Sequence, residues 1–68
     1  MNQAELNDIV EQVNNLVDDA VENIRDGYYD IAEADMVDIN YLLNQIDDKE
    51  TRETIIAGLE IDPRDFAQ

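Results

Sequence analysis

The sequence predicts an all-α fold, a small bundle of three helices followed by a short C-terminal helical turn. Apolar residues recur at spacings of three and four, and no segment shows the sustained alternation of a β-strand. The chain has 68 residues, of which 44% are apolar, although 18 acids against 4 bases give a net charge of −14. Acidic chains stay unfolded when apolar residues are scarce, which is not the case here. We expect one acidic helical domain over residues 1–68.

The first helix is predicted over residues 3–25. Asn2 is its expected N-cap, and Glu5 stands three residues later as the partner in a capping box. Gly27 lies where a helix ends in a left-handed residue. The apolar stripe consists of Leu6, Ile9, Val10, Val13, Leu16, Val17, Ala20, Val21 and Ile24.

The second helix is predicted to start with the same capping pattern, Asp30 as the N-cap and Glu33 as its partner. It is expected to end at Asp47 and Asp48, because acids oppose the dipole of a helix C-terminus and favour the next N-terminus. Its apolar stripe consists of Tyr29, Ala32, Met36, Ile39, Leu43 and Ile46.

The third helix is predicted to be short. One of the acids at 47–48 caps it, and Gly58 weakens it near its end. Its apolar face consists of Ile55, Ile56 and Leu59. Asp62–Pro63 is a typical start of a short helical turn, with Asp as the cap and Pro in the first position. We expect Phe66 to fold back onto the bundle.

The charge excludes several classes of function. Neutralising phosphates takes Lys and Arg, so we expect no direct binding to nucleic acid and no binding to an anionic membrane. Without Cys and His the chain lacks a thiol nucleophile and the commonest general base. We therefore expect no enzyme activity, no cofactor and no metal site. No signal peptide and no membrane span are visible, which favours the cytoplasm, or the host cytoplasm if the chain is viral.

The acids concentrate in residues 1–46, where eleven acids and the single base Arg25 sum to −10; residues 47–68 sum to −4. On the first helix one outward row spans about 21 Å, and a DNA strand carries a phosphate every ~3.4 Å. The row consists of Asp8, Glu11, Asn15, Asp18 and Glu22, with Asp19 beside it, and the second helix adds Asp26, Asp30, Glu33, Asp35 and Asp38. Soluble helices usually pair such acids with Lys. A row without these pairs indicates that its negative electrostatic field serves to attract a binding partner. Solubility alone, or adaptation to high salt, is the alternative.

The second helix is also apolar on the side opposite its stripe. Ala34, Val37 and Tyr41 cluster there, between Asp30 and Asp38. One interpretation is that this helix is packed between the first and the third. The other is an interface, either a homodimer seam or a docking patch. Its expected aromatic anchors are Tyr28, Tyr29 and Tyr41.

These patterns favour a small inhibitor or modulator that binds a basic nucleic-acid-binding protein or nuclease complex and presents carboxylates in place of phosphates. In size and charge, though in no motif, the chain resembles the DNA-mimic inhibitors that phages make against restriction, CRISPR or repair enzymes. An antitoxin-like or immunity partner of a basic nuclease would share the same electrostatics. The alternative is a homodimeric interaction module or adaptor whose acidity serves solubility.

Overall fold

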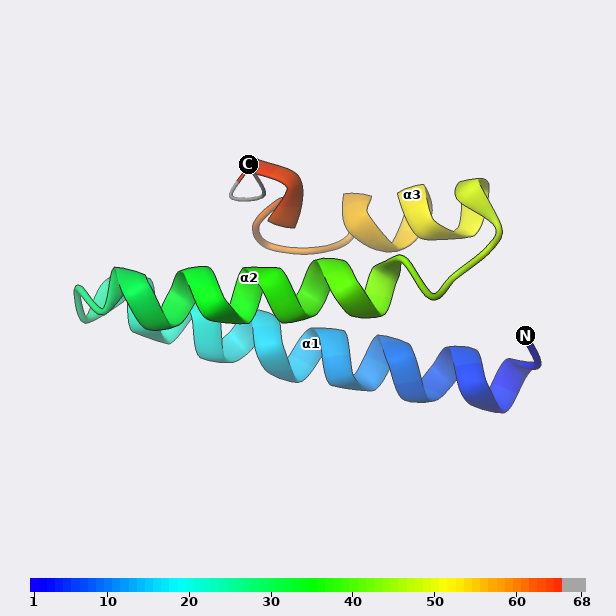
Figure 1. The fold of residues 1–68 in the computed structure, drawn as a ribbon, viewed down its shortest axis with the longest axis horizontal. Coiled ribbons are helices and arrows are strands. Elements are labelled where there is room, and N and C mark those ends of the chain that lie inside the picture. The colour runs from blue at the N-terminus through cyan, green and yellow to red at the C-terminus, as the bar shows by residue number, and fades with distance from the viewer. Residues whose placement is uncertain (66–68) are drawn as a thin grey trace.

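The computed structural model describes residues 1–65 and confirms the all-α bundle. The elements are α1 (Gln3–Arg25), α2 (Tyr29–Leu43), α3 (Lys49–Ala57) and the 3-10 helix η1 (Pro63–Asp65). Figure 1 shows α1 and α2 as an antiparallel hairpin, with α3 running back alongside α2. The molecule is elongated, 37 × 22 × 17 Å, because α1 is much the longest element.

The start of α1 is confirmed in detail. Asn2 Oδ1 accepts a hydrogen bond from the Glu5 amide at 2.9 Å, and Glu5 Oε1 accepts one from the Asn2 amide at 3.3 Å. Two amides that the helix itself leaves unpaired are thereby satisfied. Helix α1 runs over the predicted residues 3–25, since both of its end signals are local to the sequence.

The turn between α1 and α2 depends on Gly27, which has a φ of +84°. The Tyr28 amide donates to the Asn23 carbonyl at 2.8 Å, and the Gly27 amide donates to the Ile24 carbonyl at 3.1 Å. These two bonds form a Schellman motif, in which the left-handed position suits glycine because a side chain there is strained. The motif reverses the chain within three residues, so that α2 returns along α1.

The predicted capping box of α2 is wrong. Helix α2 begins at Tyr29, two residues earlier than an N-cap at Asp30 would allow, with Tyr28 as N-cap and no side-chain cap. The tight turn brings the Tyr28 carbonyl into place as the first acceptor, and the Ala32 amide donates to it at 3.1 Å. Asp30 therefore lies inside the first turn, where its charge still complements the helix dipole, and Glu33 has no N-cap partner.

The end of α2 also comes earlier than predicted, at Leu43. Ile46 is buried but lies in the linker, and its carbonyl accepts a hydrogen bond from Arg52 Nη1 at 2.7 Å. Asp48, one of the two predicted caps, is the N-cap of α3. Its carboxylate accepts a hydrogen bond from the Thr51 hydroxyl at 2.5 Å, which lowers the pKa of Asp48.

The predicted C-terminal turn is confirmed as η1. Asp62 Oδ1 accepts a hydrogen bond from the Arg64 amide at 2.9 Å. Pro63 is buried, and its carbonyl accepts a hydrogen bond from Asn40 Nδ2 on α2 at 3.0 Å. This bond ties the end of the described chain to the last turn of α2. Phe66, expected to fold back onto the bundle, lies outside the described residues.

The core lies between α1 and α2 and is closed by α3. Its buried apolar residues are Ile9, Val13, Val17, Ala20, Ala32, Met36, Ile39, Leu43, Ile46 and Ile56. Only Ile56 comes from α3, so the hairpin carries most of the buried surface that stabilises the fold. The remaining faces of α1 and α2 are left for contact with solvent or partners.

Candidate protein-binding surfaces

The outward side of α1 carries the first candidate surface, which we call the acidic face. Its members are Asp8, Glu11, Asp18, Asp19 and Glu22, and all five are exposed. They lie opposite the buried stripe that includes Val13 and Val17, because the helical repeat separates the two sets by about half a turn. Since that stripe is buried along most of α1, the core fixes the direction in which the acidic face points.

The acidic face is not evenly charged. Between Glu11 and Asp18, a step of about 10 Å along the axis, the exposed residues of the helix are the uncharged Gln12, Asn14 and Asn15. A DNA strand would place about three phosphates over the same step. The acidic face therefore consists of two clusters of carboxylates on one helix. The first is Asp8 and Glu11, and the second is Asp18, Asp19 and Glu22, which continues through exposed Asp26 into the turn.

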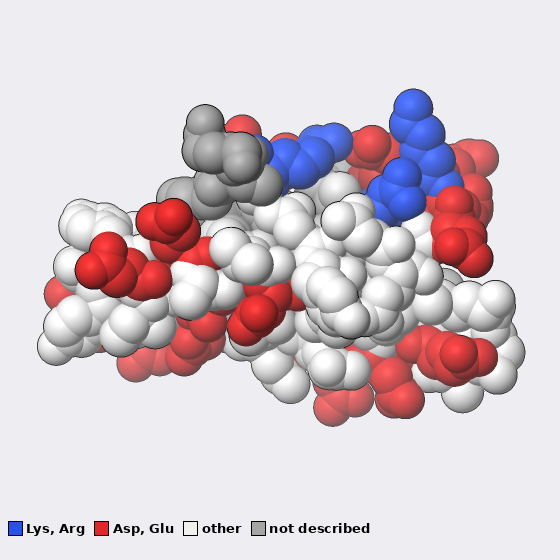
Figure 2. Space-filling model, viewed as in Figure 1, with Lys and Arg blue, Asp and Glu red and all other residues white. Residues whose placement is uncertain are grey.

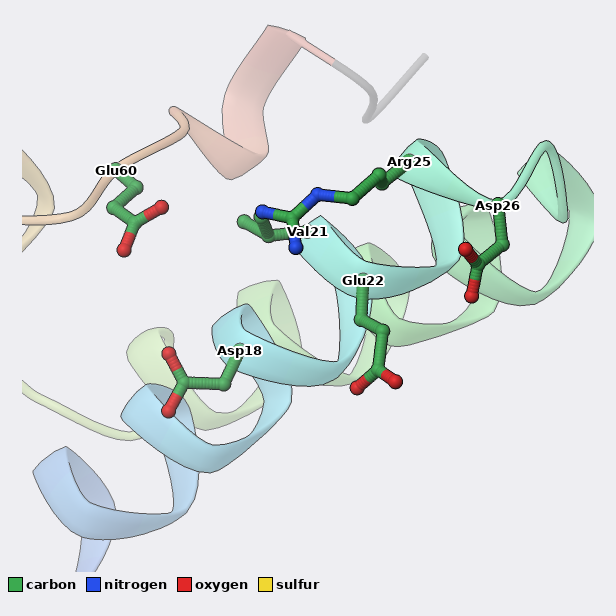
Figure 3. A pocket seen from close by; sticks show the side chains of 6 residues that line it. All are labelled: Asp18, Val21, Glu22, Arg25, Asp26 and Glu60. Carbon is green, nitrogen blue, oxygen red and sulfur yellow. The ribbon is translucent and has the colours of Figure 1, made fainter.

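Arg25 is the only base of residues 1–46 and lies at the end of the acidic face. It lines a surface hollow of about 340 Å³ together with Asp18, Val21, Glu22, Asp26 and Glu60. In Figure 3 its guanidinium group lies over Val21 and extends toward Glu60, away from Asp26. Among residues 1–65 no ion pair of Arg25 is found within 4 Å, so the acids around it keep their charge unpaired.

The remaining bases lie on the other side of the molecule. Arg64 pairs with Glu53 at 2.9 Å and with Asp62 at 2.8 Å, and the pairing lowers the pKa of Asp62. Arg52 donates a hydrogen bond to the Ile46 carbonyl. Figure 2 shows Lys and Arg only along the upper edge of this view, near α3, with Asp and Glu spread over the rest. Apart from Arg25, the positive charge of the described chain is therefore segregated from the acidic face.

The second candidate surface is the outer side of α2. Ala34, Val37 and Tyr41 form it, which we call the apolar patch, and Val37 and Tyr41 are 61% and 69% exposed. They lie opposite buried Ile39 and Leu43 on the helix. The interpretation that α2 is packed between two helices is wrong for this side, because no element of residues 1–65 covers it.

Exposed acids frame the apolar patch. Asp30, Glu33 and Asp38, all predicted site residues, lie on the same outer half of α2. Of the other expected anchors, Tyr28 and Tyr29 are also exposed but lie at the hairpin turn. Tyr29 is about 18 Å from Tyr41 along the helix axis, so the three tyrosines do not form one cluster.

Asp35 was expected on the carboxylate surface of α2, and the structure places it inside. It is only 9% exposed, at the seam between α1 and α2. Asn23 Nδ2 donates to Asp35 Oδ2 at 3.2 Å and to Asp19 Oδ2 at 3.0 Å. Burial, followed by the neighbouring Asp19 carboxylate, raises the pKa of Asp35 to about 6. Its place between Ala32 and Ile39 in the buried stripe was the signal that could have revealed it.

Within residues 1–65 no group of three or more acids is arranged to hold a metal ion. None of the described helices combines the length and the apolar character needed to cross a membrane. Comparison with models of protein families, with curated proteins and with solved structures finds no match to this chain.

Proposed function

We propose that the chain is a small inhibitor or modulator that binds the nucleic-acid-binding surface of a basic protein and excludes DNA or RNA from it. The acidic face on α1 would occupy the positions of phosphates on that surface. The observation that supports this most directly is that five exposed carboxylates lie along one rigid helix with no cation paired to them in the described structure.

The energetics of α1 favour a use for this charge. An exposed helix gains about 0.2–0.5 kcal/mol from each acid–base pair four residues apart, and loses a similar amount from each pair of like charges. Asp18 and Glu22 are such a like pair, and so are Glu22 and Asp26. Helix α1 is thus less stable than it would be with a few Lys residues among its acids. This loss of stability is understandable if the mutually repelling carboxylates are needed for binding.

The target surface supplies the attraction. A cleft that attracts phosphates attracts any rigid polyanion, and complementary fields raise the association rate. Ions condensed on the two surfaces are released on contact, so the affinity should fall steeply with salt. An immunity-type partner of a basic nuclease would act through the same contacts and belongs to the same proposal.

The test is capture of partners from a lysate of the natural cells on the immobilised chain at low salt. Nucleic-acid-binding proteins should be retained, and both a salt gradient and duplex DNA should release them. The double variant Asp18→Lys/Glu22→Lys should retain none of them. The control Asp47→Lys/Asp65→Lys has the same net charge but changes exposed acids that are not part of the acidic face, and it should bind normally. Equal loss in both variants, or capture of no such protein, contradicts the proposal.

A second candidate is a homodimeric interaction module, and the exposure of Val37 and Tyr41 favours it. In that case the acidity serves only solubility. The two candidates differ in a simple measurement, the mass of the free chain by sedimentation equilibrium. A monomer at micromolar concentration argues against the module, whereas a dimer that persists at all salt concentrations argues for it.

A further inference from the structure

We propose that the apolar patch of α2 docks against an apolar hollow or ridge of a partner protein whose rim carries Lys or Arg. The acids Asp30, Glu33 and Asp38 would meet that rim, and Val37 and Tyr41 would enter the apolar centre. This inference goes beyond the proposed function, because it concerns a different helix and would stand even if the acidic face bound nothing.

The apolar patch contributes nothing visible to the described fold. Val37 and Tyr41 point away from the core, and more than half of each side chain is exposed. Valine and tyrosine form helices less readily than Lys, Glu or Gln, by roughly 0.3 kcal/mol each. A polar residue at either position would therefore suit an isolated helix better, which indicates that the apolar side chains serve a contact outside residues 1–65.

The arrangement matches a binding site in its anatomy. Interfaces place aromatic and aliphatic anchors at the centre and polar groups at the rim, and tyrosine is among the residues that contribute most. On α2 the anchors Val37 and Tyr41 lie four residues apart on one face. Glu33 flanks them on one side and Asp38 on the other, and Asp30 lies about two turns before Val37 on the same face.

The charge around the apolar patch decides which kind of partner can bind there. Residues 26–48 contain seven acids and no Lys, Arg or His. If the patch met its own copy, acids would approach acids with no cation on either helix to offset them. Like charges brought together in an interface cost several kcal/mol. The positive charge has to come from a different protein, so the occupant is a basic partner rather than a second copy.

The size of the patch agrees with this choice. One face of a 15-residue helix is smaller than the roughly 800 Å² that each side of a standard interface buries. A contact of that area is too small for a stable dimer of two highly charged chains. It is sufficient for a modest interaction in which charge attraction adds to apolar burial.

The test uses the full chain and two synthetic helical peptides as probes. One peptide has a leucine stripe flanked by lysines, and the other has the same lysines with glutamine in place of leucine. In NMR titrations the leucine–lysine peptide should shift amides of residues 30–41 and bind about tenfold more tightly than the glutamine–lysine peptide. Equal affinity for the two peptides, or shifts spread evenly over all acids, would overturn the proposal.

Matched variants complete the test. Val37→Ser/Tyr41→Ser should lower the affinity for the leucine–lysine peptide about tenfold. The control Tyr28→Ser/Tyr29→Ser removes two aromatics of similar exposure at the hairpin turn and should leave the affinity unchanged. Circular dichroism checks that both variants fold. If the free chain is a dimer that Val37→Ser/Tyr41→Ser dissociates, the occupant is a second copy and the proposal is wrong.

Discussion

Asp35 shows how one residue departs from the behaviour of the other acids. Its carboxylate is enclosed between α1 and α2 and shares the Asn23 amide with Asp19. Removing a charged carboxylate from water is costly, and a second carboxylate nearby adds repulsion. The folded chain therefore holds the proton of Asp35 more tightly than the unfolded chain does, and the pKa rises from 3.8 to about 6.

This raised pKa predicts a pH dependence of stability. Below pH 3.8 both states carry the proton, and between 3.8 and about 6 the folded state keeps a proton that the unfolded state has lost. The contribution of Asp35 is therefore favourable at low pH and is lost as the pH rises through about 6. Above that value the full cost of the buried charge remains.

Asp35→Asn should stabilise the protein near neutral pH by about 1–2 kcal/mol, because a neutral amide can still accept from Asn23 and can donate to Asp19. The gain should shrink as the pH falls through about 6 and approach zero near pH 3.8, where Asp35 is protonated in both the folded and the unfolded chain. Urea unfolding of both proteins across this pH range measures the difference. A variant that is less stable at neutral pH, or a gain that does not change with pH, contradicts this account of Asp35.

At the scale of the element, α1 combines a rigid apolar stripe with an outward array of acids. Its last turn holds Glu22, with Asp18 one turn before it and Asp26 one turn after it. Repulsion within this cluster lowers the stability of α1, while the same cluster is proposed to meet the partner. Stability and binding should therefore respond in opposite directions to a change at this point.

Glu22→Lys should raise the free energy of unfolding by about 0.5 kcal/mol, since it places a cation four residues after Asp18 and near the C-terminus of the helix. The same change should weaken binding of the captured partner. Glu22→Gln, which removes the charge without reversing it, should fall between the wild type and Glu22→Lys in both measurements. A loss of stability in Glu22→Lys would show that the cluster does not destabilise α1 by repulsion. Undiminished binding would show that Glu22 does not meet the partner.

The elements also show which features a sequence reveals. The ends of α1 could be predicted because Asn2, Glu5 and Gly27 act on their immediate neighbours. The start of α2 could not, because the hydrogen bonds of the preceding turn decide it rather than the acid at Asp30. Helical spacing placed the acidic face and the apolar patch, but whether α3 covered the patch depended on tertiary packing.

At the scale of the whole molecule, the net charge of −14 is confined to a body only 37 Å long. The screening length is about 30 Å at 10 mM salt and about 8 Å at 150 mM. At low salt nearly every carboxylate therefore feels the others, and compact folding brings them closer together. The pairs made by Arg64 offset this repulsion only on the α3 side.

Added salt should therefore stabilise the protein. We expect the free energy of unfolding to rise by about 1 kcal/mol between 10 and 150 mM NaCl. KCl should have the same effect at equal concentration, because screening does not depend on the identity of the cation. Glu22→Lys, with two fewer net negative charges, should gain less. Unfolding experiments in each salt test this, and a fall in stability would mean that ion pairs outweigh the repulsion.

The most direct test of the central claim is competition between the chain and duplex DNA for the captured nucleic-acid-binding protein. The account predicts that DNA displaces the chain completely, that no ternary complex forms, and that the affinity for the chain falls at least about tenfold between 50 and 200 mM salt. A partner that holds the chain and DNA at the same time, with an affinity unchanged by salt, would contradict it.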